Sequence, residues 1–263
     1  MSDWFWIRHG PTHEKNFTGW RDVPADLSDR ALIDRLSAYL PPEAVVVSSD
    51  LTRSVTTADA LAGGRTRLPH EADLREFHFG DWDGRHWSDV AQTDPQLSRD
   101  FWEKPGDIMA PNGESWNMAA ARARPVVDRL TAAHNSIIAV AHFGIILTQV
   151  QRALDSSAYA CLAHKIDNFS VTHLREDQGE WQVIPNIQTC GPREASPRVC
   201  EVSNPLQPCY RPTSHMHHHR SRRRWLPGDP QLRHPRVPQR SWLEAPPRYE
   251  QTRQQALHPQ QTL

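Results

Sequence analysis

The sequence predicts an α/β protein, a three-layer α/β/α sandwich with a mainly parallel sheet, followed by a disordered C-terminal tail. Two observations carry this prediction. Through residues 1–188, short apolar runs alternate with longer amphipathic segments, which is typical of strands buried on both faces and of helices that cover them. Residues 189–263 contain 12 Pro and show no sustained apolar period, so neither a helix nor a central strand is expected there.

The first predicted elements alternate between strand and helix. "DWFWI" at 3–7 is a short run of large apolar side chains and predicts a buried strand. Residues 27–40 place leucines at helical spacing among polar residues, which predicts an amphipathic helix. "AVVVSS" at 44–49 is dense in β-branched residues and predicts a second strand. A helix is expected over 50–63, ended by two consecutive glycines.

A long helix and a third strand follow in the middle of the chain. Residues 113–134, "GESWNMAAARARPVVDRLTAAH", have the helical pattern, but Pro125 interrupts it. Proline lacks a backbone N–H and crowds the preceding turn, so this helix is expected to be kinked or divided. The fully apolar run "SIIAVA" at 136–141 predicts the third strand.

The last predicted elements are one helix and an antiparallel pair of strands. Residues 144–154, "GIILTQVQRAL", continue as a helix after the third strand. Residues 169–176 and 180–185 alternate apolar and polar side chains around "DQG", which predicts a hairpin. About 190 residues are enough for a sizeable hydrophobic core.

Charge is distributed unevenly along the chain. Residues 1–188 contain 26 acidic side chains against 18 Lys and Arg, about −8, and residues 189–263 contain 12 Arg against five acidic side chains, about +7. The basic segment is interpreted as a solvated, disordered tail, for which a nucleic-acid or metal contact through "HMHHHRSRRRW" is the weaker alternative. Its switch to Arg, Pro, His and Gln without Lys also raises the hypothesis of an altered reading frame.

Cysteine usage and hydropathy limit the classes of protein further. No pair of cysteines has CxxC spacing and three lie in the tail, so neither a disulfide framework nor a zinc site is expected. The four are Cys161, Cys190, Cys200 and Cys209. The first residues carry no basic leader, and no apolar run approaches the length of a membrane span. We therefore expect a cytoplasmic protein with no membrane attachment.

Ligand-type side chains follow each of the three predicted parallel strands. The first strand ends in Arg8-His9-Gly10, and the second leads through "SSD" to Arg53 in the first turn of a helix. The third ends at His142. Ligands of open α/β sheets bind beyond the carboxyl ends of the strands, where strand order reverses. Two histidines and two arginines are therefore expected to converge on one spot.

This set of residues suits phosphoryl transfer. Two guanidiniums in one crevice need an anion between them, and their planar forks match phosphate oxygens, with amides of helix N-termini as further donors. His9 is a candidate nucleophile, and His142 a charged donor to the phosphoryl oxygens. A carboxylic acid must protonate the leaving oxygen. In "LREFHFGDWDG" (74–84) we select Glu76, which aromatic neighbours would bury, while Asp81 and Asp83 remain alternatives.

Four segments in order resemble the histidine phosphatase superfamily, which also contains the cofactor-dependent phosphoglycerate mutases. They are "RHG" at the end of the first strand, "SSDLTRSVTTA" (48–58), "LREFHFGDWDG" (74–84) and "VAHFG" (140–144). The resemblance spans residues 4 to 186. It implies a phosphorylated nucleophile, two phosphate ligands, a second pocket histidine and a proton donor; in that order these are His9, Arg8 with Arg53, His142 and Glu76.

The segment 16–28, "NFTGWRDVPADLS", also looks like the part of the family that follows RHG. By that likeness Asn16, Thr18 and Gly19 line the substrate side, although Asn16 lies one residue further from the nucleophile than the mutases suggest. Phe143 stands where a small residue is common, which reshapes the wall of the pocket. The resemblance implies no metal and no cofactor.

The predicted function is hydrolysis of a phosphomonoester through a phosphohistidine. The segment 74–84 resembles the phosphatase branch, including the alpha-ribazole phosphatase type, and the chain lacks the larger insertions common in mutases. A cofactor-dependent mutase and a catalytically silent phosphate-binding protein are the two alternatives. The partner is expected to be a small phosphorylated metabolite, which the substrate-facing loop between residues 84 and 116 does not identify.

Overall fold

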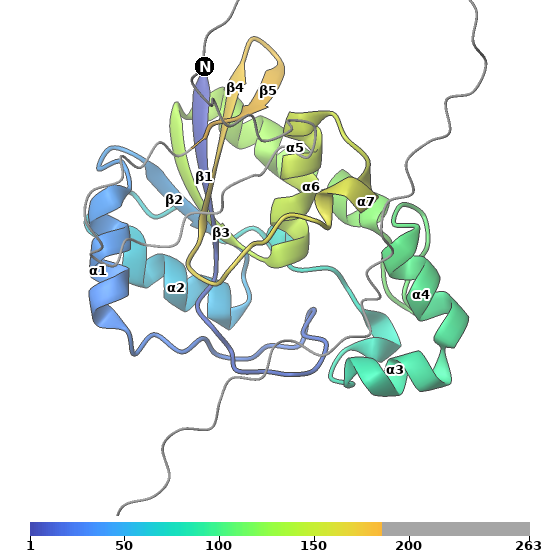
Figure 1. The fold of residues 1–263 in the computed structure, drawn as a ribbon. Helices are drawn as coiled ribbons and strands as arrows, with labels where there is room; N and C mark the ends of the chain where they lie inside the picture. The colour runs from blue at the N-terminus through green and yellow to red at the C-terminus, as the bar shows by residue number, and fades with distance from the viewer. Residues whose placement is uncertain (186–263) are drawn as a thin grey trace, which may run out of the picture. The chain divides into compact units, whose positions relative to one another are not determined.

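A computed structural model describes residues 1–185. Its sheet has five strands in the order β2-β3-β1-β4-β5 (Figure 1). The first three strands of that order run parallel, and β4 and β5 add an antiparallel hairpin at one edge. Their bounds are β1 Ser2–Arg8, β2 Val45–Ser48, β3 Ser136–Ala141, β4 Val171–Asp177 and β5 Glu180–Val183. The predicted α/β class and the mainly parallel core of the sheet are confirmed.

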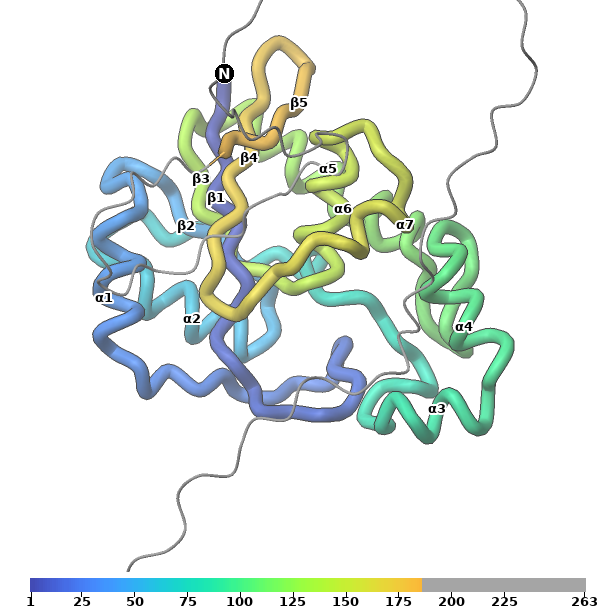
Figure 2. Tube along the Cα trace, viewed as in Figure 1, coloured from blue at the N-terminus to red at the C-terminus, as the bar shows by residue number. Residues whose placement is uncertain are grey.

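Helices cover both faces of this sheet. On one face α1 packs on α2, which contacts β2 and β3, and on the other α5 packs on α6, which contacts β1. Figure 2 shows the two pairs on opposite sides of β1 and β3. The α-helices are α1 Arg30–Tyr39, α2 Thr52–Ala62, α3 Trp87–Thr93, α4 Pro95–Glu103, α5 Trp116–Ala133, α6 Phe143–Leu154 and α7 Ala158–Cys161. Two short 3₁₀ helices, η1 Ala72–Leu74 and η2 Gly80–Trp82, lie between α2 and α3.

The strands are apolar throughout because each face of the sheet has its own core. Trp4 and Trp6 of β1 pack in the core under α5 and α6, whereas Phe5 and Ile7 pack in the core under α1 and α2. Side chains of a strand point alternately to its two faces, so a strand covered on both sides carries no polar stripe. This explains why "DWFWI" reads as a continuous apolar run.

Two expectations for the middle of the chain are corrected. Pro125 does not divide α5, which runs unbroken over 18 residues. Pro125 and Ala121 are both exposed, so the carbonyl that loses its helical donor lies on the solvated side of the helix. The segment 84–116 is not simply a loop, because it contains α3 and α4. Both are short, and the Asp94-Pro95 step separates them.

The topology reverses between β1 and β3. From β1 the chain passes to α1 on one face, and from β3 it passes to α6 on the other. Adjacent strand ends that lead to opposite faces leave a crevice between them, which is where ligands bind in open α/β sheets. Within residues 1–185 no helix is both long and apolar enough to cross a bilayer. The predicted tail, with Cys190, Cys200 and Cys209, lies outside the described residues.

Candidate active site

His9 follows β1 directly and is held by its backbone. Its N–H donates to the carbonyl of Ala141 at 3.1 Å, and its own carbonyl accepts from Asn168 Nδ2 at 2.7 Å. His9 Nδ1 lies 2.7 Å from the carbonyl oxygen of Gly10. A carbonyl can only accept, so Nδ1 carries the proton and Nε2 keeps its lone pair. Burial, followed by the charge of Arg53, lowers the pKa of His9 to about 3, so the imidazole is neutral.

His142 follows β3 and lies beside His9. The two ring centroids are 5.0 Å apart. His142 Nε2 lies 2.7 Å from Ser49 Oγ, which in turn accepts from the N–H of Leu51. The Ser49 hydroxyl can donate to Nε2, and in that arrangement His142 carries its proton on Nδ1. That Nδ1 is buried and has no hydrogen-bond partner among the described residues.

The charge state of His142 depends on its burial. Burial first, and then the positive charge of Arg53, hold the pKa of His142 well below its usual value. The side chain is fully buried. Burial therefore favours the neutral form of His142 in the protein without ligand, and its role as a charged donor to a phosphoryl group stays a prediction.

Arg53 is a fully buried cation in the first turn of α2. Its Nη1 donates to the carbonyl of Arg21 at 3.0 Å and its Nη2 to the carbonyl of Gly19 at 2.6 Å. Within residues 1–185 no carboxylate forms an ion pair with it, and its Nε has no hydrogen-bond partner. A buried guanidinium held only by carbonyls keeps its positive charge available to an anion.

Arg8, the last residue of β1, brings the second guanidinium. Its Nη1 donates to the carbonyl of Ile166 at 2.7 Å, and its guanidinium carbon lies 5.6 Å from the ring centroid of Phe143. The charges of Arg8 and Arg53 both act on His9, His142 and Glu76, lowering the pKa of each. The two arginines therefore lie close enough to the two histidines and Glu76 for their charges to act on them.

Glu76 lies between η1 and η2, and its carboxyl group contacts the first turn of α6. Its Oε1 accepts from the N–H groups of Phe77 at 2.9 Å and Gly144 at 3.0 Å. Burial raises the pKa of Glu76, against these hydrogen bonds and the arginine charges. Oε1 accepts from two backbone donors, whereas Oε2 accepts only the longer branch of the Gly144 hydrogen bond at 3.3 Å, so Oε2 is the better placed oxygen to carry a proton. A Cβ at Gly144 would lie 2.6 Å from Glu76 Oε1, so this approach requires glycine.

The two alternative carboxylates have other partners. Asp83 accepts from the backbone N–H groups of Gly19 at 3.0 Å and Arg21 at 2.9 Å, which fixes the loop that supports Arg53. Asp81 is exposed and accepts from Asn112 Nδ2. Neither shares the amide of Gly144 with Glu76, which makes Glu76 the better candidate for the acid.

The side chains predicted to line the substrate side are engaged with backbone. Asn16 Nδ2 donates to the carbonyl of Gly84 at 2.8 Å, and Thr18 Oγ1 donates to the carbonyl of Asn16 at 3.0 Å. Gly19 approaches the main chain so closely that a Cβ would lie 2.5 Å from the carbonyl oxygen of Phe77. These contacts shape the loop under Arg53, and a direct contact of Asn16, Thr18 or Gly19 with substrate stays a prediction.

Two backbone amides that were expected to bind the anion already donate to carboxylates. The helix N-termini were expected to offer amides to the anion, but the N–H of Thr52 at the start of α2 donates to Asp22 Oδ1 at 2.7 Å. At the start of α6 the N–H of Gly144 donates to Glu76. These two amides therefore position carboxylates instead of facing a ligand.

Several supporting residues carried no signal in the sequence. Thr57 accepts from the N–H of Gly10 and donates to the carbonyl of Arg53, which links the segment after β1 to the first turn of α2. Arg122 of α5 donates to the carbonyl of Glu76 at 2.9 Å and forms an ion pair with Glu114 at 2.6 Å. A hydrogen bond to a backbone carbonyl depends on the fold and not on residue spacing, so these roles could be found only in three dimensions.

The arrangement combines four chemical properties in one place. His9 is a neutral imidazole with a free Nε2, and two guanidiniums supply positive charge. His142 offers a buried N–H, and Glu76 is a carboxyl group whose raised pKa favours the protonated form. A buried nucleophile, an anion cradle and a general acid together suit transfer of a phosphoryl group.

Curated relatives match most of the described residues. Phosphoglycerate mutase-like protein 4 of Arabidopsis thaliana is 30% identical over 202 residues, which cover 70% of this chain and 86% of that protein. A metal-independent phosphoserine phosphatase of the same plant is 28% identical over 70% of this chain and 83% of its own length. The adenosylcobalamin/alpha-ribazole phosphatase of Salmonella typhimurium is 27% identical over 68% of this chain and 87% of its own length.

Solved structures agree with the sequence relatives. Bacillus stearothermophilus YhfR superposes with a TM-score of 0.63 at 26% identity, covering 70% of this chain and 95% of that one. A mycobacterial glucosyl-3-phosphoglycerate phosphatase superposes with a TM-score of 0.61 at 26% identity, covering 70% and 97%. The sequence profile of the histidine phosphatase superfamily (branch 1) matches residues 4–185. The chain therefore belongs to the histidine phosphatase superfamily.

Proposed function

We propose that this protein is a phosphomonoester phosphatase that acts through a phosphohistidine on a small phosphorylated metabolite. The observation that carries the proposal is the hydrogen bond from His9 Nδ1 to the carbonyl of Gly10. It fixes the tautomer whose Nε2 is a nucleophile, beside a buried arginine that forms no ion pair with a carboxylate of residues 1–185. Relatives named as phosphatases support the same class of reaction.

The first half of the reaction forms a bond to His9. The lone pair of Nε2 attacks phosphorus, the bond from phosphorus to the ester oxygen breaks, and its electron pair passes to that oxygen. Glu76 gives the oxygen its proton, so the leaving group departs as a neutral alcohol. Arg8, Arg53 and the Nδ1–H of His142 stabilise the negative charge on the remaining phosphoryl oxygens.

The second half restores the enzyme. The ionised carboxylate of Glu76 takes a proton from water as the water oxygen attacks phosphorus. The nitrogen–phosphorus bond breaks, its electron pair returns to Nε2, and inorganic phosphate leaves. The hydrogen bond from Nδ1 persists throughout, so the imidazole keeps one orientation in both halves.

Release of phosphate from p-nitrophenyl phosphate tests this proposal. We expect turnover by the wild type and a loss of about 10³-fold or more in His9→Ala, since the nucleophile is removed. His134→Ala is the matched control, because His134 lies at the opposite end of β3. Equal activity in wild type and His9→Ala would refute the mechanism.

A second measurement separates hydrolysis from mutase chemistry. A mutase returns the phosphoryl group to a bound sugar acid and depends on 2,3-bisphosphoglycerate. We expect hydrolysis that does not require this compound, with one phosphate released for each alcohol formed. Isomerisation of a phosphoglycerate that starts only when 2,3-bisphosphoglycerate is added would favour the mutase instead.

A further inference from the structure

We infer that the leaving group of the substrate is apolar, an aromatic or alkyl alcohol, and that it binds in an aromatic pocket beside Glu76. The inference rests on the proposed function. A general acid must lie within hydrogen-bond reach of the oxygen that it protonates. The carbon skeleton attached to that oxygen therefore lies on the Glu76 side of the phosphoryl group.

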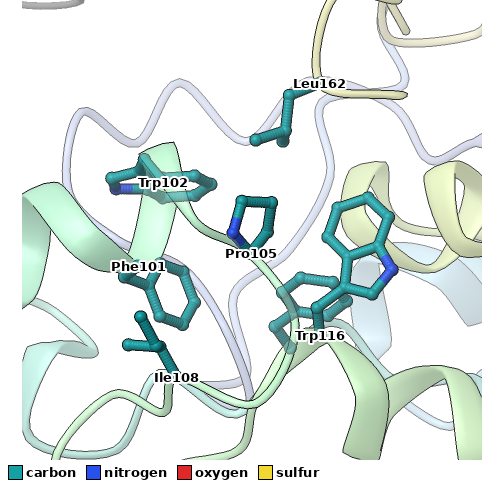
Figure 3. Close-up of a pocket in the computed structure, with 7 residues that line it drawn as sticks. Phe101, Trp102, Pro105, Ile108, Trp116 and Leu162 are labelled. Carbon is teal, nitrogen blue, oxygen red and sulfur yellow. The ribbon is translucent and has the colours of Figure 1, made fainter. Parts of the chain in front are cut away.

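An apolar surface begins at this point. The pocket that contains Glu76 and Gly144 outlines about 220 Å³ of space, part of it open to solvent. A second pocket of about 210 Å³ continues it away from the histidines and reaches Phe101, Pro105 and Ile108 (Figure 3). The two pockets share four lining side chains: Phe77, Trp102, Trp116 and Leu162. We call the two together the aromatic pocket.

The lining offers almost no hydrogen bonds to a ligand. Glu76 is the only ionisable side chain among the residues of either pocket. The indole Nε1 of Trp116 already donates to Gln151 Oε1 at 2.5 Å. Trp102, Phe143 and Leu162 are only partly buried although they pack against the core. Removing such half-exposed apolar surface from water is the gain that an apolar ligand would provide.

Four basic side chains on segments that contact the site are already engaged with carboxylates. A leaving group with its own carboxylate or second phosphate would need an additional cation. The four pairs are Arg21 with Glu14, Arg75 with Asp50, Arg122 with Glu114 and Lys165 with Asp167. An acidic leaving group must therefore compete with these carboxylates.

The pocket therefore disfavours polar leaving groups as well as favouring apolar ones. A hydroxyl-rich or anionic leaving group would lose its hydration against Phe77, Trp102 and Leu162 without gaining protein partners. An apolar one would lose nothing and would cover side chains that water now contacts. Even one methylene in such a pocket changes kcat/KM about tenfold or more. The structure therefore favours alkyl and aryl esters over sugar and acid phosphates.

Esters of primary alcohols of similar acidity provide the test, because leaving-group reactivity then stays nearly constant. Phosphate release is measured for benzyl phosphate, hexyl phosphate, glycerol 3-phosphate and 3-phosphoglycerate. We expect kcat/KM for benzyl and hexyl phosphate to exceed that for glycerol 3-phosphate by about tenfold or more. A preference for glycerol 3-phosphate or 3-phosphoglycerate would overturn the inference and leave the phosphatase proposal standing.

Two variants assign the preference to the pocket. Leu162→Gln replaces a side chain by one of similar size, and Trp102→Ala removes one. In both variants we expect the ratio of kcat/KM for benzyl phosphate to that for glycerol 3-phosphate to fall at least about fivefold, mainly because kcat/KM for benzyl phosphate falls. Trp87→Ala is the matched control, since Trp87 is 40% exposed and lines neither pocket. An unchanged ratio in both folded variants would refute the pocket assignment. If no ester is hydrolysed in a His9-dependent way, the proposed function falls and this inference with it.

Discussion

The candidate active site and the aromatic region next to it are built in opposite ways. The aromatic region is the group of contacting rings formed by Phe77, Trp82, Phe101, Trp102 and Trp116. The site places buried polar groups together and leaves Arg53 Nε and His142 Nδ1 without hydrogen-bond partners among the described residues. In the aromatic region the buried indoles are satisfied, with Trp82 donating to Asp94 and Trp116 to Gln151. The site keeps polar groups available to a ligand, whereas the buried indole N–H groups of Trp82 and Trp116 are already satisfied.

This difference separates the determinants of reaction from those of stability. Rings of the aromatic region contact one another, such as Phe101 with Trp102 at 5.0 Å and with Trp82 at 5.4 Å between centroids. Such pairs stabilise a fold beyond their buried area. Buried cations and neutralised imidazoles cost stability unless a ligand compensates them. Variants in the two regions should therefore differ in what they lose.

The largest loss of activity is expected when the buried cation is removed. Arg53→Met keeps the length of the side chain but abolishes its charge, and kcat/KM should fall about 10³-fold, the scale for a lost transition-state donor. Inorganic phosphate should raise the Tm of the wild type by mass action but not that of the variant. Phosphate release and thermal unfolding with and without phosphate measure both effects. Arg129→Met, an exposed arginine paired with Glu71, serves as the control.

A smaller loss is expected from the support beneath Glu76. Arg122 bonds to Glu114 and to the carbonyls of Arg75 and Glu76, so Arg122→Met frees the segment that positions the acid. Activity should fall about 10- to 100-fold, because small displacements of catalytic groups are costly. Removing one partner of this nearly buried pair should also cost about 3 kcal/mol of stability.

Arg129→Met on the same helix again provides the control for this prediction. The readout that isolates Glu76 is the pH dependence of kcat/KM, whose alkaline limb should move in Arg122→Met. A variant that loses stability but keeps both its activity and its pH profile would show that Arg122 supports the fold alone.

Lowering the pH should destabilise the candidate site more than the aromatic region. The pKa of His9 is about 3 in the folded protein and about 6.5 when unfolded. Between these two values the unfolded chain binds a proton that the folded protein does not. The contribution of neutral His9 to the free energy of unfolding is therefore complete above pH 6.5 and is lost as the pH falls toward 3. The slope from one such imidazole is at most about 1.4 kcal/mol per pH unit.

Urea unfolding of the wild type and His9→Gln between pH 7 and 4 measures this contribution. The difference in unfolding free energy should shift in favour of His9→Gln as the pH falls. The raised pKa of Glu76 has the opposite slope, but it is present in both proteins and cancels in the difference. Parallel pH curves for the two proteins would contradict the prediction.

The smallest effect on activity is expected in the aromatic region. Val90 of α3 is fully buried in the core that contains these rings. Val90→Ala removes two methyl groups and should cost about 2 kcal/mol of stability, with activity per folded molecule within about twofold of wild type. Chemical denaturation and phosphate release measure the two quantities. A large loss of turnover at unchanged stability would contradict the proposal that the aromatic region supports stability and the candidate site supports the reaction.

The fold was predictable where the local pattern decides the structure. β3 matches the predicted run at 136–141, and Gly63 ends α2 in the left-handed region as expected. Gly179 in the predicted turn between β4 and β5 also has a positive φ. α3 and α4 were missed because short helices around Asp94 show too few turns for a period to appear.

For the site, the sequence could indicate residues at strand ends but not the state of their side chains. The ends of β1 and β3 are neighbours in the sheet, which brings His9 and His142 together. The lowered pKa of His142 follows from its complete burial, and the support of Glu76 from carbonyls that Arg122 reaches. Burial and backbone hydrogen bonds arise from the assembled fold, so no motif reports them.

The central position of β1 has a consequence for how this chain is made. Ser2 pairs with Glu176 and Asp3 pairs with Ser136, so β1 waits for partners translated more than a hundred residues later. Pairings so distant in sequence slow folding and leave apolar strand surface uncovered in the meantime. The strand that leads into His9, the proposed nucleophile, is thus the one that a nascent chain must protect longest.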